Sequence, residues 1–173
     1  MALTYLHPVR FAIAVLLTAS GCQQSTNPEL DTSEDLYFSS FESDADSAGW
    51  SGYGGGWFDQ DAPPDGGARS LRVSGGCIVP HFSRRVVAPA VPCSVSLTFW
   101  GKNLALGGGV SLRPTDGVGP EIQVSVQETD WTRYRSASRI HCRPGDTLVL
   151  DLISGGIIYG AMRVDLLEVR IDE

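Results

Sequence analysis

The most constraining feature of this sequence is an alternation of apolar and polar residues within short segments. In residues 93–102 (CSVSLTFWGK), every second residue from Val95 to Phe99 is apolar. Residues 121–127 (EIQVSVQ) and 147–153 (TLVLDLI) show a similar period of two. Because successive side chains of a β-strand point to opposite faces of a sheet, this period predicts strands with one buried face.

The rest of the chain follows the same pattern. Residues 161–171 predict a strand whose phase changes around Leu166 and Leu167, which indicates a bulge. The 20 glycines and 10 prolines fall mostly between the predicted strands, where turns need them. We therefore expect an all-β chain, a single jelly-roll β-sandwich of two antiparallel sheets. Its remaining strands are predicted at 36–42, 68–74, 110–113 and 131–142.

The N-terminus is typical of an export signal. Arg10 precedes the apolar run 11–17 (FAIAVLL), which is far shorter than the roughly 20 residues that span a bilayer. The small residues 19–21 then lead directly into Cys22, as at a signal cleavage site. This ending resembles the lipobox of bacterial lipoproteins, although Ala19 stands where leucine is commoner. The alternative is an ordinary secretory signal followed by a coincidental cysteine.

The lipobox resemblance implies cleavage before Cys22 and acylation of its thiol and new amino group. It divides the chain into a signal peptide at 1–21, a lipidated cysteine with a flexible polar tether at 22–35, and a folded domain at 36–173. Several acyl chains anchor a protein stably to a membrane. We therefore expect an exported protein on the bacterial cell envelope. The absence of aspartate directly after Cys22 implies the outer membrane if the organism is Gram-negative.

Composition argues against two classes of function. The net charge is −7, whereas nucleic-acid-binding proteins concentrate Lys and Arg on one face, so we expect no nucleic acid partner. Beyond the signal, His81 and His141 are the only histidines, which leaves few general bases. The acidic residues form no pair with the spacing of a glycosidase. We therefore expect no enzymatic activity.

Three cysteines follow Cys22 in the chain: Cys77, Cys93 and Cys142. An exported protein enters an oxidising compartment, so one disulfide and one remaining thiol are expected. Cys93 opens one predicted strand and Cys142 closes another. If these strands are antiparallel neighbours, the two cysteines face each other, which favours the pair Cys93–Cys142. The alternative is Cys77–Cys93.

A series of motifs points to a known family. In chain order they are Phe41-Glu42 with a following Trp50, a strand at 70–76 (SLRVSGG), a strand at 96–102 (SLTFWGK), a hairpin at 129–134 (TDWTRY) and a closing strand at 163–169 (RVDLLEV). Together they resemble the galactose-binding-like β-sandwich, in particular carbohydrate-binding modules appended to xylanases and glucanases. The resemblance spans residues 36–173. It implies a jelly-roll fold and, less specifically, binding of a glycan.

The resemblance also implies a structural Ca²⁺, because such modules commonly hold one where the first and last strands meet. The matching positions are Glu42 and Asp165, with Asp44 nearby. Carboxylates from two strands and backbone carbonyls would supply the oxygen ligands that Ca²⁺ requires. The alternative is that these acids lie on the surface or pair with Arg163 or Arg170.

A glycan-binding face combines an aromatic ring with side chains that hydrogen-bond hydroxyl groups. The outward residues of the strand at 121–127 and of the next strand, across a tight turn at 128–130, provide such a mixture. A neighbouring strand joins them if the preferred cysteine pairing holds. The alternative is that a loop covers Trp100 and the other side chains are merely solvated. The predicted ligand-binding residues are Trp100, Lys102, Gln123, Gln127, Arg133 and Arg135.

The glycine-rich segment 49–58 (GWSGYGGGWF) is a second candidate. Its aromatic residues Trp50, Tyr53 and Trp57 either form a binding edge or cap one end of the sandwich. Capping is favoured for Trp50, which matches a family position. Together these observations predict a non-catalytic envelope lipoprotein that binds a polysaccharide weakly through a sheet face. The alternative is a structural or assembly lipoprotein that binds a protein partner at the envelope.

Overall fold

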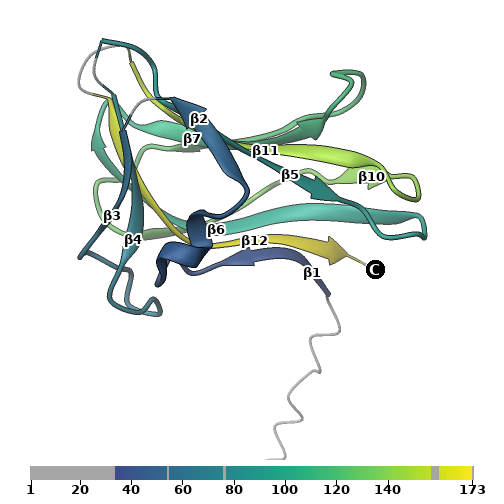
Figure 1. Ribbon diagram of the computed structural model, residues 1–173, viewed down its shortest axis with the longest axis horizontal. Coiled ribbons are helices and arrows are strands. Elements are labelled where there is room, and N and C mark those ends of the chain that lie inside the picture. Colours follow the sequence, from purple (N-terminus) through teal and green to yellow (C-terminus); the bar gives the residue numbers. More distant parts are fainter. Residues whose placement is uncertain (1–33, 54, 76, 157–159, 173) are drawn as a thin grey trace, which may run out of the picture. The chain divides into compact units, whose positions relative to one another are not determined.

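The computed structural model describes residues 34–53, 55–75, 77–156 and 160–172 (Figure 1). The predicted signal peptide, Cys22 and nearly all of the tether therefore lie outside the described residues. Within the described part of the chain, no helix has the length and apolar character needed to cross a membrane.

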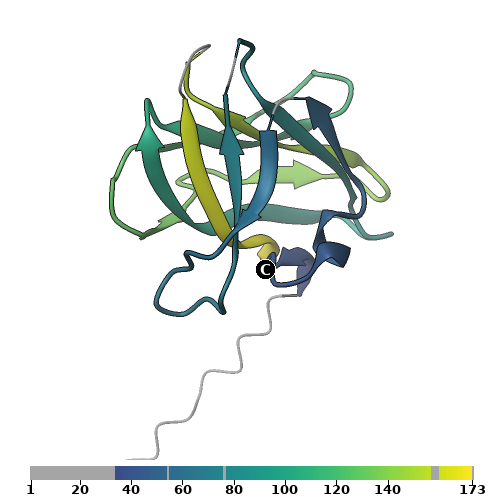
Figure 2. The same ribbon diagram turned by 60° about the vertical axis from the view of Figure 1, so that its left-hand side comes forward.

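The described strands form two antiparallel sheets, as the alternation predicts. The first, called the large sheet, has seven strands in the order β10-β6-β12-β4-β3, with β1 paired to β12 and β9 paired to β6. Figure 2 shows β12, β4 and β3 side by side. The strands of the large sheet are β1 (Asp35–Ser39), β3 (Gly55–Asp59), β4 (Ser70–Ser74), β6 (Cys93–Ala105), β9 (Thr132–Arg135), β10 (Ile140–Cys142) and β12 (Ala161–Asp172).

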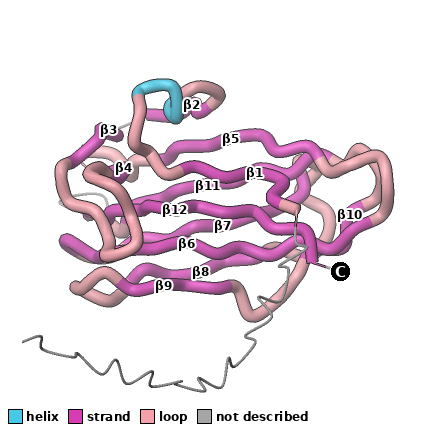
Figure 3. Tube along the Cα trace, turned by 90° about the horizontal axis from the view of Figure 1, so that it is seen from below, coloured by secondary structure: helices cyan, strands magenta, loops and turns pink. Residues whose placement is uncertain are grey.

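The second sheet, called the small sheet, has five strands in the order β2-β5-β11-β7-β8. A short 3-10 helix, η1 (Asp44–Ser47), precedes its edge strand β2 (Figure 3). The strands of the small sheet are β2 (Trp50–Tyr53), β5 (His81–Val87), β7 (Gly108–Pro114), β8 (Ile122–Val126) and β11 (Thr147–Ser154).

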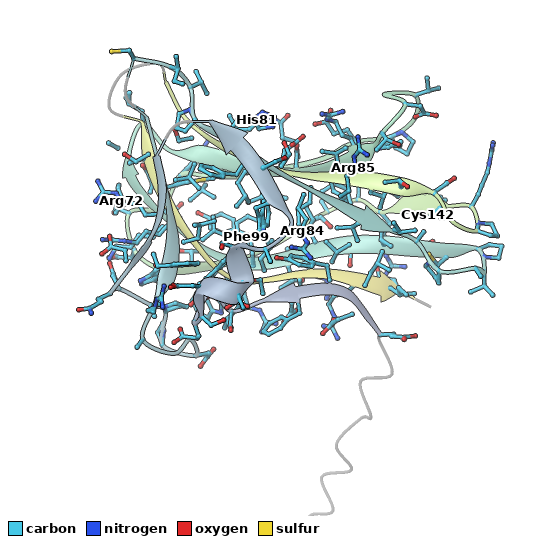
Figure 4. All side chains as sticks on the ribbon, in the orientation of Figure 1. Arg72, His81, Arg84, Arg85, Phe99 and Cys142 are labelled. Carbon is cyan, nitrogen blue, oxygen red and sulfur yellow. The ribbon has the colours of Figure 1, made fainter. Side chains whose placement is uncertain are left out.

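The core lies between the two sheets and consists of the alternating apolar residues. Leu97 and Phe99 of β6 are fully buried, as are Leu150 and Leu152 of β11. Figure 4 places Phe99 between the sheets, where its ring stacks on that of Tyr134 at a centroid distance of 5.3 Å. Burying each such side chain contributes about 1.5–3 kcal/mol to folding. The predicted all-β sandwich is confirmed.

The bulge predicted near Leu166 is confirmed. The pairing of β12 with β6 shifts register between Asp165 and Glu168, and Leu166 adopts a positive φ of 45°. A residue inserted into one strand of an antiparallel pair produces this shift. The bulge divides β12 into a part that pairs with β4 and a part that pairs with β1.

The single strand predicted at 131–142 is wrong, because the structure divides it into β9 and β10. The interruption begins at Ser136, whose hydroxyl oxygen accepts a hydrogen bond from the Leu97 N–H and donates one to the Ser138 carbonyl. A serine side chain that hydrogen-bonds the backbone competes with regular strand pairing.

Three strands were absent from the prediction. β2 and β3 lie in the glycine-rich segment 49–58, for which no strand was predicted. Glycine is required there, since a Cβ at Gly52 would lie 1.9 Å from the His81 carbonyl oxygen of the adjacent β5. β5 was not predicted because Arg84 interrupts its alternation of apolar and polar residues. The Arg84 guanidinium lies 4.4 Å from the Tyr37 ring centroid and donates to the Ala48 carbonyl, which compensates for its inward position.

The antiparallel pairing of β10 with β6 places Cys142 directly opposite Cys93. The predicted facing of these two cysteines is confirmed. Cys77, Cys93 and Cys142 all carry free thiols in the structure, so the disulfide itself is not present. Burial, together with the neighbouring Cys93, raises the pKa of the Cys142 thiol to about 11.

Candidate functional site

The outer face of the small sheet carries a row of polar residues that crosses all of its strands. Residues directly opposite each other on neighbouring strands share one face of a sheet. The pairing register links five such residues in sequence across the sheet, and each has a side chain that can donate or accept a hydrogen bond. This polar row consists of Ser51, Ser83, Asp151, Ser111 and Gln123.

Asp151 organises the polar row from its centre. Its side chain is nearly fully buried, yet both carboxylate oxygens accept hydrogen bonds. Oδ1 accepts one from the Ser83 hydroxyl at 2.6 Å and one from His81 Nε2 at 2.8 Å. Oδ2 accepts one from Arg113 Nε at 3.2 Å. The buried carboxylate therefore fixes the orientation of three polar side chains that face outward.

The contacts among Ser83, His81 and Asp151 differ from a catalytic relay. In a serine–histidine–aspartate triad the imidazole contacts the hydroxyl with one nitrogen and the carboxylate with the other. Here His81 Nε2 lies 2.9 Å from the Ser83 oxygen and 2.8 Å from Asp151 Oδ1. The Ser83 hydroxyl also donates directly to the carboxylate. This arrangement suits hydrogen-bond recognition rather than activation of a nucleophile.

Two further rows flank the polar row on the same face. One places Arg85 and Arg113 on either side of Val149. The other runs through His81 and Ile153, and the Ile153 side chain is 37% exposed. Figure 4 shows His81 and Arg85 on the outer side of β5, whereas Arg84 points toward the other sheet. The face thus offers apolar contact area beside its hydrogen-bonding groups.

The small-sheet face is hollowed at two places. One hollow, of about 330 Å³, is lined by Ser111, Gln123, Ser125, Gln127 and Ile153 among others. The other, of about 520 Å³, lies toward the opposite edge of the sheet. It is lined by Gly49, Ser51, Ser83, Arg84, Arg85 and Val149. Both hollows border the polar row, so a bound chain that follows the row would pass them both.

The sequence-predicted ligand residues do not share one face. Gln123 lies in β8 and Gln127 directly follows it, whereas Trp100, Lys102, Arg133 and Arg135 lie in β6 and β9. β8 pairs with β7 of the small sheet, and β9 pairs with β6 of the large sheet. The predicted hairpin through 128–130 is therefore wrong. The chain crosses between the sheets there, which period-two alternation alone cannot reveal.

Polar groups on the outer face of the large sheet bind one another. Asp61 accepts hydrogen bonds from Lys102 Nζ at 3.1 Å, from Trp131 Nε1 at 2.9 Å and from Arg163 Nη1 at 2.5 Å. Arg163 also donates to Asp59, and this hydrogen bond holds the pKa of Asp59 below its usual value. The network ties the segment after β3 to the sheet, and it engages Lys102.

Trp100 and the two predicted arginines lie near this network. Trp100 is half-buried and stands opposite the exposed Arg133 on β9. Arg135 lies 4.0 Å from Asp172, at the end of β12. The preferred cysteine pairing did place β6 correctly beside the strand that ends at Cys142. The large sheet therefore carries four of the predicted ligand residues, and many of its polar side chains already hydrogen-bond one another. The four are Trp100, Lys102, Arg133 and Arg135.

Trp50 caps the edge of the sandwich, as the sequence analysis favoured. It packs against the core, and its Nε1 donates a 3.0 Å hydrogen bond to the Tyr37 hydroxyl. The rings of Trp50 and Phe41 lie 6.4 Å apart. The side chains of Tyr53 and Trp57 lie outside the described residues.

Two of the three predicted calcium ligands lie close together. Asp165 is fully buried, and loss of solvation together with the negative charge of Glu42 raises its pKa to about 7. The Glu42 carboxylate accepts hydrogen bonds from the N–H groups of Ala68 and Arg69, which hold its pKa below the usual value. Asp44 instead pairs with Arg69 at 2.9 Å, and its side chain is 89% exposed. The three acids therefore do not form one cluster.

The glycine-rich segment before β4 closes over these two acids. A Cβ at Gly66 would lie 2.5 Å from Asp165 Oδ2, and one at Gly67 would lie 2.4 Å from the Glu42 carboxyl carbon. Asp165 Oδ2 is buried without a hydrogen-bond partner in the structure. A buried, unpartnered carboxylate oxygen beside a second carboxylate and close backbone suits a hard divalent cation. The residues present therefore fit Ca²⁺, and Glu42 and Asp165 are the carboxylates that would hold it.

The sequence matches no protein-family model and no curated protein. Among solved structures, the CBM22-1 xylan-binding domain from Paenibacillus barcinonensis is similar, with a TM-score of 0.54 and 18% identity over 80% of this chain and 94% of that one. TmCBM61, solved with β-1,4-galactotriose, gives 0.52 at 18% identity over 72% and 90%. The fold is that of a carbohydrate-binding-module-like β-sandwich.

A third similar structure belongs to a much longer chain. The enzymatically active domain of tailspike protein 4 from bacteriophage CBA120 matches with a TM-score of 0.57 and 16% identity over 72% of this chain. The match covers 20% of the tailspike chain. At such identities the likeness describes the fold, and the ligand must be argued from the residues of this chain.

Sequence reasoning missed most of the polar row. Its centre, Asp151, appeared only as one residue of an alternating strand, and Ser83 lies in a strand that was not predicted. Gln123 was singled out correctly as an outward residue. The sequence signal that points to Asp151 is its charge. It is an acid among the outward residues of a strand whose inward residues are Leu148, Leu150 and Leu152. A carboxylate in the middle of a central strand needs partners from both neighbouring strands.

Proposed function

We propose that this protein binds a polysaccharide through the outer face of the small sheet. The observation that carries this proposal is the polar row, in which a buried Asp151 holds Ser83, His81 and Arg113 in fixed orientations. Preoriented hydrogen-bonding groups lose little conformational freedom on binding, which favours recognition of hydroxyl-rich ligands. Ile153 and Val149 add apolar contact area for the C–H surfaces of a sugar ring.

Two of the similar structures support a glycan as the ligand. One is described as a xylan-binding domain, and the other was solved with a galactotriose. We propose that this chain acts as a non-catalytic module. Its Ser83, His81 and Asp151 lack the geometry of a nucleophile relay, which supports this assignment.

The N-terminal sequence supports a location for this module. We propose that Cys22 is lipidated after export, which anchors the protein to the cell envelope and holds the domain on a polar tether. A polysaccharide at the envelope would then be the ligand within reach. Metabolic labelling with a palmitate analogue tests this point, with Cys22→Ser as the control that loses the label.

We further propose two stabilising features of the domain. Ca²⁺ held by Glu42 and Asp165 would neutralise the two acids, of which Asp165 is buried, and fix the segment around Gly66. A Cys93–Cys142 disulfide would join β6 to β10 after export. Its formation removes one hydrogen from each thiol, and the two electrons and two protons pass to the disulfide of an oxidised thiol oxidoreductase.

The experiment that tests glycan binding is retention of the purified protein in native gels that contain single polysaccharides. We expect retention by at least one polysaccharide, loss of retention in Gln123→Ala and unchanged retention in Trp100→Ala. The opposite result for the two variants would move the site to the large sheet. No retention by any polysaccharide, with a protein partner recovered by co-purification, would contradict the proposal.

A further inference from the structure

We infer that the bound glycan carries carboxylate groups, and that a uronic acid residue occupies the hollow between β2 and β5. This inference rests on the proposed polysaccharide binding and specifies its substrate class. The hollow, called the cationic hollow below, is lined by Gly49, Ser51, Ser83, Arg84, Arg85 and Val149 and measures about 520 Å³.

Two adjacent arginines of β5 line the cationic hollow, and their side chains point to opposite faces of the strand. Arg85 points outward and is exposed, whereas Arg84 points toward the other sheet (Figure 4). Arg84 is held in place by the Ala48 carbonyl, which accepts from its Nη1, and by the Tyr37 ring. A guanidinium has five N–H donors, so these contacts leave Arg84 with further donors.

The space around Arg84 is closely defined. A Cβ at Gly49 would lie 2.8 Å from Arg84 Nη1, so this glycine allows the guanidinium to reach its position. Gly49 also has a positive φ of 80°, which favours glycine there. These contacts hold Arg84 beside Gly49, which lines the cationic hollow.

The charge balance of the cationic hollow is opposite to that of the chain. The described residues that line it include two arginines and no carboxylate, whereas the chain has a net charge of −7. The nearest acid of the polar row is Asp151, whose oxygens already accept bonds from Ser83, His81 and Arg113. Glu121 lines the other hollow, at the far edge of the sheet. Arginine pairs readily with carboxylates, often through two parallel hydrogen bonds.

The hydroxyl groups of Ser51 and Ser83 complete the recognition surface. Both belong to the polar row, and both line the cationic hollow. A sugar ring in the hollow can therefore present its carboxylate to the outward Arg85 and a hydroxyl to a serine. With neighbouring strands about 4.8 Å apart, the row spans roughly 19 Å across the sheet in total, the hollow included. This length accommodates several sugar residues beyond the uronic acid.

The test compares affinity electrophoresis of the purified protein on polygalacturonate, a neutral galactan and dextran sulfate. We expect retention on polygalacturonate that weakens as salt is added, and little retention on the neutral galactan. Arg85→Gln should lower the affinity for polygalacturonate roughly tenfold or more, since a charge-assisted hydrogen bond is lost. The matched control is Arg143→Gln, which makes the same charge change in the β10–β11 turn and should retain the original affinity.

The outcomes distinguish this inference from the proposed function. Equal retention on galactan and polygalacturonate, with Arg85→Gln behaving like Arg143→Gln, would overturn the inference and leave glycan binding in place. Retention on dextran sulfate without polygalacturonate would overturn the assignment of a carboxylate. No retention on these or any other polysaccharide would overturn glycan binding itself.

Discussion

Ser83 on β5 donates a 2.6 Å hydrogen bond to the buried carboxylate of Asp151 on the neighbouring strand β11. This contact joins an outward-facing hydroxyl to a charge within the sheet. Because Asp151 also binds His81 and Arg113, one carboxylate links three strands of the small sheet. The candidate site is therefore part of the framework of the sheet, and changes to Asp151 should affect both stability and binding.

Asp151→Asn should weaken glycan binding and destabilise the fold. The amide has one acceptor oxygen and an N–H₂ group, so it cannot accept from Ser83, His81 and Arg113 in the same geometry. We expect a loss of about 1–3 kcal/mol in the free energy of unfolding, measured by urea denaturation. Thr147→Asn, in the same strand, is the control for a change on the outer face. Full stability and full binding in Asp151→Asn would contradict the role given to this carboxylate.

Without Ca²⁺, stability should fall as the pH rises from about 4 to about 7. The pKa of Asp165 is about 7 in the folded protein and 3.8 ordinarily, so the folded state retains a proton that the unfolded state releases in this window. The unfolding free energy therefore decreases with pH, by up to about 4 kcal/mol in total. Denaturant titrations with a chelator at several pH values measure this slope. Asp165→Asn should remove it, and an unchanged slope in that variant would assign the effect elsewhere.

Addition of Ca²⁺ at neutral pH should raise the melting temperature of the protein. A ligand that binds only the folded state stabilises it by about 2.7 kcal/mol at one hundred times its dissociation constant. Glu42→Gln should lose most of this gain, whereas Asp44→Asn should keep it, because Asp44 pairs with Arg69 and is exposed. Scanning calorimetry with and without Ca²⁺ provides the measurement. If Asp44→Asn lost as much of the Ca²⁺-dependent rise in melting temperature as Glu42→Gln, Asp44 would be a third ligand, as the sequence predicted.

The three thiols of the reduced protein should react in a defined order. Cys77 is exposed and should be modified first, whereas Cys142 is buried with a pKa of about 11 and should be modified last. In protein isolated from an oxidising compartment, peptide mapping should find Cys93 joined to Cys142. Reduction should then cost about 2–4 kcal/mol in the free energy of unfolding. A Cys77–Cys93 peptide would show that the alternative pairing forms.

The fold was predictable because its signal is local. The alternation around Leu97 and Phe99 reports one buried face whatever the neighbouring strands are, and the phase change at Leu166 reports the bulge directly. Strand order is not local, so the sequence placed β8 and β9 in one hairpin although they belong to different sheets. β5 was not predicted because Arg84 takes an inward position, where it contacts Tyr37 and Ala48, which are far away in the chain.

The candidate site was less predictable than the fold for the same reason. Gln123 in β8 and Gln127 directly after it were identified as outward residues from the local alternation, and both are exposed. Their partners on the same face, Ser83 and Asp151, become visible only when the register between β5, β11, β7 and β8 is known. Trp100 was a reasonable candidate from composition, but the large sheet half-buries it. Glu42 and Asp165 were predicted to lie together because the family resemblance places a site where the first and last strands meet.

The most direct test of the account is the affinity of single-residue variants from the two sheets for whichever polysaccharide the protein binds. Ser83→Ala and Gln123→Ala alter the polar row, whereas Trp100→Ala and Arg133→Ala alter the large sheet. Isothermal titration calorimetry on variants of confirmed fold should show weaker binding for the first two and unchanged binding for the second two. Unchanged binding in Ser83→Ala and Gln123→Ala together with lost binding in Trp100→Ala would contradict a site on the small sheet.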